Sequence, residues 1–197
     1  MAFDAGRIEA AVAEILAAIG DDPGRPGLAS TPRRVAEAYA DFFAGLDQDP
    51  LVHLAETKEL DGELGELVLL RDIDFRSICE HHLLPFTGRA HVAYLPGKRI
   101  VGLGKLPRVV ETLASRPQLQ ERLTEEIADA LDEGLEPNGV LVVLDAVHGC
   151  VSARGPRQAG SSTVTIASRG LLTDPAQRAA VLVLLGHSIS GSGSDGA

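Results

Sequence analysis

Residues 67–97 read LVLLRDIDFRSICEHHLLPFTGRAHVAYLPG. The first part, 67–79, is rich in strand-forming side chains. Residues 89–97 alternate in side-chain character, as in a strand with one buried face, before a Pro-Gly turn. We expect these two runs to be neighbouring strands that form a hairpin. The first run ends in a cysteine and two adjacent histidines follow in the turn, so the stretch that starts the sheet also holds candidate metal ligands.

Downstream of this hairpin, the pattern predicts a helical segment followed by two further strands. The long helix is indicated by apolar residues at steps of four: Leu119, Leu123, Ile127, Leu131 and Leu135. The run VLVVLDAVHGCVSARG from residue 140 and the run STVTIASRG from residue 162 predict an antiparallel strand pair, and 175–185 predicts a C-terminal helix. This order predicts an α+β fold with a four-stranded antiparallel sheet and helices on one face.

The N-terminal part is predicted to be a helical appendage. Its first helix shows apolar residues at helical spacing, namely Ile8, Val12, Ile15, Leu16 and Ile19. A second helix is expected to start with Ser30 or Thr31 as its cap and Pro32 in its first turn. We therefore divide the chain into an appendage at 1–60, a catalytic domain at 61–187 and a Ser/Gly-rich disordered tail at 188–197.

Composition excludes several classes of function. The chain has 197 residues, 45% of them hydrophobic, which suffices for one domain with an appendage. A formal net charge of −10 disfavours coating of nucleic acid, because phosphate binding needs a broad basic surface. The sequence contains no long apolar run and no secretion signal, so we predict no membrane association and a cytoplasmic location. In a reducing compartment the two cysteines more often bind metal than form a disulfide.

Both cysteines and three of the six histidines lie in two short segments. The spacing of Cys79 and His82 lets a thiolate and an imidazole reach one cation, and Cys150 can supply a third ligand from the later strand. Two thiolates and one imidazole suit zinc and leave a fourth position for water. The alternatives are a closed structural site that uses His81 or His148 as fourth ligand, and unrelated buried thiols and histidines.

Basic residues near glycines form a second candidate site, for a polyphosphate. They are Lys98, Arg99, Lys105 and Arg108, with Arg154 and Arg157 just after the second cysteine. Arginine binds phosphate oxygens bidentately and lysine acts as a point charge. The alternative is a solvated loop with ordinary surface charge, which we prefer for Lys98 and Arg99.

Several segments together resemble the GTP cyclohydrolase I family. They are SICEHHLLPFTGRAHVAYLPG, GLGKLPRVVETLASRPQLQERLTEEIADAL, HGCVSARG and STVTIASRG, in this order and spacing. The similarity runs from about Thr31 to Gly170. The resemblance implies a tunnelling fold (T-fold), a homo-oligomer, usually a decamer of stacked rings, with active sites at subunit interfaces, and GTP as substrate.

The resemblance also implies roles for individual residues. Zinc would be bound by the residues that match the family's ligands, Cys79, His82 and Cys150, and the matching histidines His81 and His148 would be acid-base groups. The substrate would be bound by further matching residues: Glu121 on the purine with Gln120 beside it, Lys105, Arg108 and Arg154 on the triphosphate, and Arg34 from a neighbouring subunit. The implied reaction is hydrolysis at C8 of GTP, which releases formate and forms 7,8-dihydroneopterin triphosphate, the first step of folate and pterin biosynthesis.

One departure from the family pattern keeps alternatives open. The family usually has GLSK where this chain has GLGK, so Gly104 replaces a serine near the ribose and phosphates. A paralogue that stops at a formamidopyrimidine intermediate, or that feeds a specialised 7-deazapurine or pterin pathway, is therefore the second hypothesis, and a non-enzymatic zinc-stabilised ring protein is the third. Outside the site, we interpret His91 as a packed, hydrogen-bonded histidine, and we expect Glu80 to orient a neighbouring imidazole.

Overall fold

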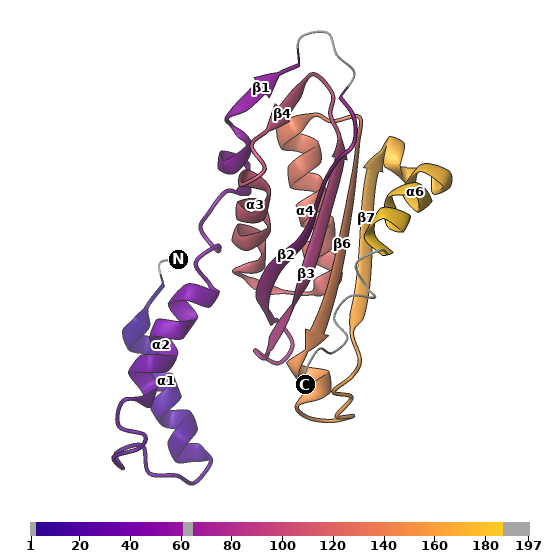
Figure 1. Cartoon of the computed structure of the whole chain (residues 1–197). Coiled ribbons are helices and arrows are strands. Elements are labelled where there is room, and N and C mark those ends of the chain that lie inside the picture. Colours follow the sequence, from indigo (N-terminus) through magenta and orange to yellow (C-terminus); the bar gives the residue numbers. More distant parts are fainter. Residues whose placement is uncertain (1–2, 61–64, 187–197) are drawn as a thin grey trace, which may run out of the picture.

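The computed structural model describes residues 3–60 and 65–186. Figure 1 shows a twisted sheet with helices packed against it and a helical pair standing apart at the N-terminal end. The helices and strands follow one another as α1 Ala5–Ala18, α2 Thr31–Phe42, η1 Pro50–Leu54, β1 Thr57–Glu59, β2 Val68–Cys79, β3 Pro85–Leu95, β4 Arg99–Val101, α3 Lys105–Ala114, β5 Pro117–Gln118, α4 Gln120–Leu135, β6 Gly139–His148, α5 Gly149–Ser152, β7 Thr163–Gly170, η2 Leu171–Thr173 and α6 Pro175–Gly186.

The main sheet has the strand order β5-β2-β3-β6-β7. The four long strands are antiparallel, and the expected hairpin is confirmed because β2 pairs with β3, with Ser77 opposite Phe86. The prediction of four strands was incomplete, since β5 adds a fifth strand parallel to β2, with Pro117 opposite Ile78. Two residues are too short to produce an alternating pattern, so the sequence showed no sign of this strand.

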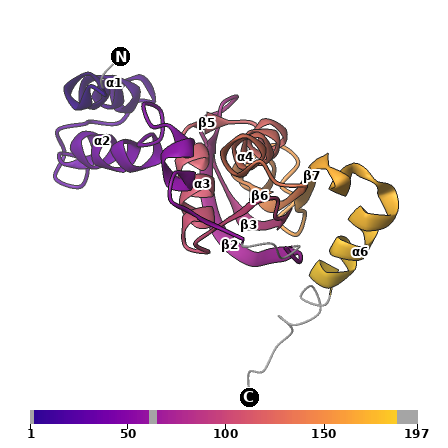
Figure 2. The ribbon, with the colours of Figure 1, turned by 90° about the horizontal axis from the view of Figure 1, so that it is seen from above.

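Helices cover both faces of the sheet, which corrects the prediction of helices on one face. Alternate residues of β6 point to opposite sides, and Val140 and Val142 join the larger core beneath α3 and α4. Leu141 and Val143 point the other way and pack with Val181 of α6 in a second, smaller core. Figure 2 shows α3 and α4 together on one side of the sheet, and α6 beyond β7, the strand at one edge of the sheet.

The N-terminal helices form as predicted but bury little surface. Helices α1 and α2 pack on each other, and α1 contains no buried residue, with 58% of Ile15 exposed. The following η1 segment, in contrast, is anchored in the sheet domain because its Leu54 is 2% exposed within the larger core. Strand β1 then pairs with β4, Thr57 opposite Val101. The division of the chain at residue 60 stays a prediction.

The other sequence predictions for single elements have mixed outcomes. The long helix is confirmed as α4, which begins after Leu119, and the C-terminal helix is confirmed as α6. The strand predicted from residue 140 ends at His148, and the chain continues as the short helix α5. The predicted disordered tail at 188–197 lies outside the described residues. Within 3–60 and 65–186, the structure contains no helix of the length and apolarity that crossing a membrane requires.

Candidate metal centre and active site

The first part of the site is the turn between β2 and β3, residues 79–84. Cys79 is the last residue of β2 and is 6% exposed. Its carbonyl accepts hydrogen bonds from the amides of His82 and Leu83, and its own amide donates to the carbonyl of Leu84 at 2.9 Å. Leu83 takes a left-handed backbone conformation with φ 51°. This tight turn brings the ring Nδ1 of His82 to 3.9 Å from Cys79 Sγ.

The second part of the site is the end of β6, which pairs with β3 so that His148 lies opposite Phe86. Cys150 follows within helix α5, so the prediction that it lies in the later strand was wrong. The backbone turn nevertheless directs it to the first part of the site. The ligand atoms of Cys79, His82 and Cys150 all lie within 4.8 Å of one another.

The two thiols influence each other. Burial raises the pKa of the Cys150 thiol above its ordinary value, and the nearby Cys79 raises it further, while the positive charge of Arg154 acts in the opposite direction. Two thiolates this close repel each other unless a cation lies between them. The donor set therefore fits a cation that binds thiolate and imidazole.

His148 is held by a polar contact on one side of its ring and an aromatic contact on another. Its Nε2 lies 2.7 Å from the side-chain oxygen of Gln120, and its ring stacks on Phe86 with a centroid distance of 4.6 Å. The amide nitrogen of Gln120 donates to the carbonyls of Thr163 at 2.8 Å and Leu144 at 3.2 Å. Neither carbonyl can donate, so the amide oxygen must face His148 and accept its Nε2 proton.

These hydrogen bonds define the protonation of His148. The neutral ring carries its proton on Nε2, which leaves Nδ1 as the atom that can accept or release a proton. Burial lowers the pKa of His148 below its ordinary value, and the charge of Glu121 partly offsets that effect. The ring is therefore neutral at pH 7.

Other predicted site residues lie nearby. Glu121 and Arg154 are exposed, and their charges act on His148 and Cys150 respectively. Glu121 also borders an open depression of about 340 Å³ together with Thr165. His81 is exposed, and its ring lies edge to face with that of His82 at a centroid distance of 6.1 Å.

Four predicted substrate-binding residues lie away from the candidate metal centre. Lys105 is the first residue of α3 and forms an ion pair with Glu56 at 2.8 Å. Helix α3 is about 15 Å long at the usual rise per residue, and it is the chain beyond its other end that enters β5, where Gln118 lies opposite Cys79. Arg108 borders a separate depression of about 440 Å³. Gly104 is exposed before α3, and Arg34 is exposed in α2.

Two contacts of the site were missed from the sequence. The hydrogen bond between Gln120 and His148 joins residues 28 positions apart, and no local pattern indicates it. Glu80 does not orient an imidazole as expected, because its carboxylate forms an ion pair with Arg122 at 2.6 Å. The interpretation of His91 is confirmed, since its Nδ1 accepts a hydrogen bond from the amide of Asp72.

Fold and site together define a mixed α+β protein with a candidate metal centre of two thiols and one imidazole beside a half-buried histidine whose pKa is lowered. The model of the family GTP cyclohydrolase I matches residues 8–186, and the chain belongs to this family.

Relatives from several bacteria agree with this assignment. GTP cyclohydrolase 1 of Leifsonia xyli subsp. xyli is 62% identical over 184 residues, which cover 93% of this chain and 96% of the relative. The GTP cyclohydrolase 1 proteins of Rhodopirellula baltica and Bacillus subtilis are each 54% identical, over 95% and 89% of this chain and 81% and 93% of their own lengths. The apo crystal structure of archaeosine synthase QueF-Like has a TM-score of 0.44 at 16% identity, covering 55% of this chain and 97% of that one, a level at which a shared fold does not follow.

Proposed function

We propose that this chain is a zinc-dependent GTP cyclohydrolase I that converts GTP to 7,8-dihydroneopterin triphosphate and formate. The observation that carries the proposal is the convergence of Cys79, His82 and Cys150 within 4.8 Å, in a chain that is 62% identical to a GTP cyclohydrolase 1. A cytoplasmic enzyme with the T-fold, as the family resemblance implies, is part of this proposal.

Zinc is the metal that the donor set suits best. Zinc binds thiolate sulfur at about 2.3 Å and imidazole nitrogen at about 2.0–2.1 Å, and sites with three protein ligands keep one position open. Cys79, His82 and Cys150 would be those ligands. When bound, zinc supplies the Lewis acidity that makes a water molecule nucleophilic near neutral pH.

His148 would move the proton during hydrolysis at C8. Because its ring is neutral at pH 7 and its Nε2 proton is donated to Gln120, it must first accept a proton at Nδ1 and can then give that proton to a ring nitrogen of guanine as the ring opens. His81 is exposed and free of that constraint, and we assign it to the proton transfers at the ribose.

Guanine would be recognised at the start of α4. Glu121 is exposed there, and its carboxylate can accept hydrogen bonds from the exocyclic amine and ring N–H of guanine, which adenine does not present. Gln120 is 1% exposed, and its amide is already bonded to His148 and β7. A direct substrate contact by Gln120 stays a prediction, and its hydrogen bonds favour a role in holding His148.

The triphosphate site would be completed by another subunit. Arg154 lies beside Cys150, but Lys105 begins α3 at the far end of that helix, and Arg108 faces a different depression. Arg34 lies in the helical pair that stands apart from the sheet in Figure 1. This separation supports the proposal that basic residues of a neighbouring copy reach each active site in a homo-oligomer, a decamer by family resemblance.

Gly104 favours a second candidate function. A Cβ at this position would meet no heavy atom within 4 Å beyond its chain neighbours, so the fold itself does not require glycine. If a hydroxyl here assists the ribose rearrangement, ring opening would survive without it and a formamidopyrimidine would accumulate. Gly104→Ser would then restore pterin formation without disturbing the packing.

The test is incubation of the zinc-loaded protein with GTP, followed by formate release and by fluorescence of the oxidised neopterin product. Equal amounts of formate and neopterin are expected. Formate without neopterin would support the second candidate, and Gly104→Ser would then raise the neopterin yield. Neither product, from protein with zinc bound, would overturn both.

A further inference from the structure

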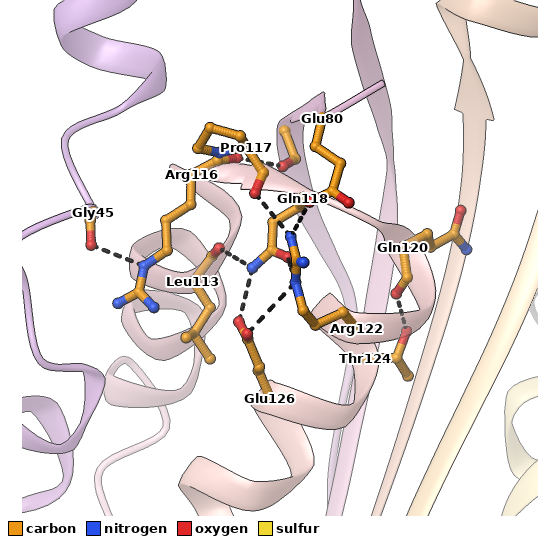
Figure 3. A network of polar contacts seen from close by, with 11 residues as sticks. Gly45, Glu80, Leu113, Arg116, Pro117, Gln118, Gln120, Arg122, Thr124 and Glu126 are labelled. Atoms are coloured by element: carbon orange, nitrogen blue, oxygen red, sulfur yellow. Dashed lines mark hydrogen bonds and ion pairs between the residues drawn. The ribbon is translucent and has the colours of Figure 1, made fainter. Parts of the chain in front are cut away.

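The guanidinium of Arg122, in the first turn of α4, contacts three parts of the chain (Figure 3). It forms an ion pair with Glu80 at 2.6 Å, donates to the side-chain oxygen of Gln118 at 3.0 Å, and donates to the carbonyl of Pro117 at 3.1 Å. Glu126 on the next turn of α4 lies 3.7 Å away. One side chain therefore joins the turn after β2, strand β5 and helix α4.

The contacts of Gln118 extend this link to the metal-binding turn. Gln118 lies opposite Cys79 in the pairing of β5 with β2, and its carbonyl accepts a hydrogen bond from the amide of Glu80 at 3.1 Å. Its side chain is 1% exposed and donates to Glu126 at 2.8 Å and to the carbonyl of Leu113 at 3.0 Å. Glu80 is thus held through both its backbone and its carboxylate, directly after a candidate ligand.

Arg122 also lies next to the residues that support the other half of the site. Gln120, two residues earlier on α4, holds the Nε2 proton of His148, and Glu121 lies between them. Any shift of the start of α4 relative to the turn at 79–84 would change the position of His148 and Glu121 relative to Cys79 and His82.

We propose that Arg122 is a positioning residue that acts through Glu80, holding the metal-binding turn and the start of α4 in one arrangement. This inference rests on the proposed function for the roles of the metal and of His148. Both charged side chains are partly exposed, at 43% for Arg122 and 32% for Glu80. Such pairs add little to global stability, so the effect of Arg122 should be on geometry and not on folding.

Arg169 provides a matched control. It also reaches α4, where it forms ion pairs with Glu125 and Asp129 at 2.6 Å, but it comes from β7 and has no contact with the turn at 79–84 among the hydrogen bonds and ion pairs described for it. Arg169→Met therefore removes a comparable bridge to the same helix without touching the candidate ligands.

The test uses the full-length chain with Arg122→Met, Glu80→Gln, Arg122→Lys and Arg169→Met, each checked for folding by circular dichroism. Zinc affinity is measured by competition with a chromogenic chelator. Loss of a group that orients metal ligands typically costs about 10- to 100-fold in affinity. We expect a loss of this size for Arg122→Met, a smaller one for Glu80→Gln and Arg122→Lys, and less than a twofold change for Arg169→Met.

Hydrogen exchange of the metal-free protein separates this inference from the proposed function. Exchange in residues 79–84 should be faster in Arg122→Met than in wild type, while Arg169→Met leaves this segment unchanged. Unchanged exchange and unchanged zinc affinity in a folded Arg122→Met or Glu80→Gln variant would overturn the inference. If wild type itself bound no zinc, the proposed metal centre would fail, and the exchange result would still decide the role of Arg122.

Discussion

Replacing Gln120 with methionine removes the side-chain contacts that hold His148 while nearly conserving volume. Gln120 is 1% exposed, but the groups that it leaves behind on His148 and Thr163 are only partly shielded from water. The His148 Nε2 proton and the Thr163 carbonyl lose their side-chain partner. Because both groups are only partly buried, we take the low end of the usual cost of about 1–3 kcal/mol for each unsatisfied buried group, which gives about 2 kcal/mol in the free energy of unfolding.

The assay is thermal unfolding at a fixed protein concentration. For a chain of this size, about 2–4 °C of Tm is lost per kcal/mol, so this loss should lower Tm by about 4–8 °C. A companion variant, Gln120→Glu, keeps an acceptor for His148 but loses the amide donor. The two variants should therefore shift the pKa of His148 in opposite directions.

The direction of each pKa change follows from the hydrogen bond at 2.7 Å between His148 and Gln120. An ionised carboxylate at this distance stabilises the imidazolium and raises the pKa of His148, whereas methionine removes an acceptor that favours the charged form and lowers it. NMR titration of ring-labelled histidine measures both shifts. Shifts of the same sign, or an unchanged Tm in Gln120→Met, would refute the assignment of the His148 tautomer and its support.

Three further outcomes are expected. Leu54→Ala should destabilise the protein by about 2–5 kcal/mol, because a nearly fully buried leucine is lost from the core beneath α3 and α4; a denaturant midpoint equal to that of wild type would contradict this. Burial lowers the pKa of His91, against the opposing charges of Asp72 and Asp145, so the unfolded chain binds a proton more readily than the folded one. The free energy of unfolding should therefore fall as the pH drops below about 6.5, and its dependence on pH should be shallower in His91→Gln. Urea unfolding between pH 7 and 5 measures both slopes, and identical slopes would argue against this expectation. Removal of metal with a chelator should abolish GTP turnover and make both Cys79 and Cys150 titratable with a thiol reagent. Re-addition of zinc should reverse both effects. Thiols that react equally with and without zinc would exclude the two cysteines as ligands.

Local sequence patterns predicted most of the helices and strands, and the elements that they missed have a physical explanation. The four-residue spacing from Leu123 to Leu135 predicted α4, because a helix repeats its contact face every three to four residues. The hairpin of β2 and β3 was predicted because its strands are adjacent in sequence. The two-residue strand β5 and the placement of α6 on the opposite face were not, since both depend on which distant surface each segment packs against.

The candidate site, too, was predicted from the sequence only in part. The sequence by itself determined that Cys79 and His82 share a turn, since three residues of chain allow few separations, and it indicated Cys150 as a candidate third ligand. Resemblance to a family supplied the role of His148 as an acid-base group. Only the tertiary structure brought Cys150 to that turn through the pairing of β6 with β3, matched Gln120 to His148, and separated Lys105 from the metal centre. These relations join residues far apart in the chain, and they are decided by strand register and core packing, which no short stretch of sequence encodes.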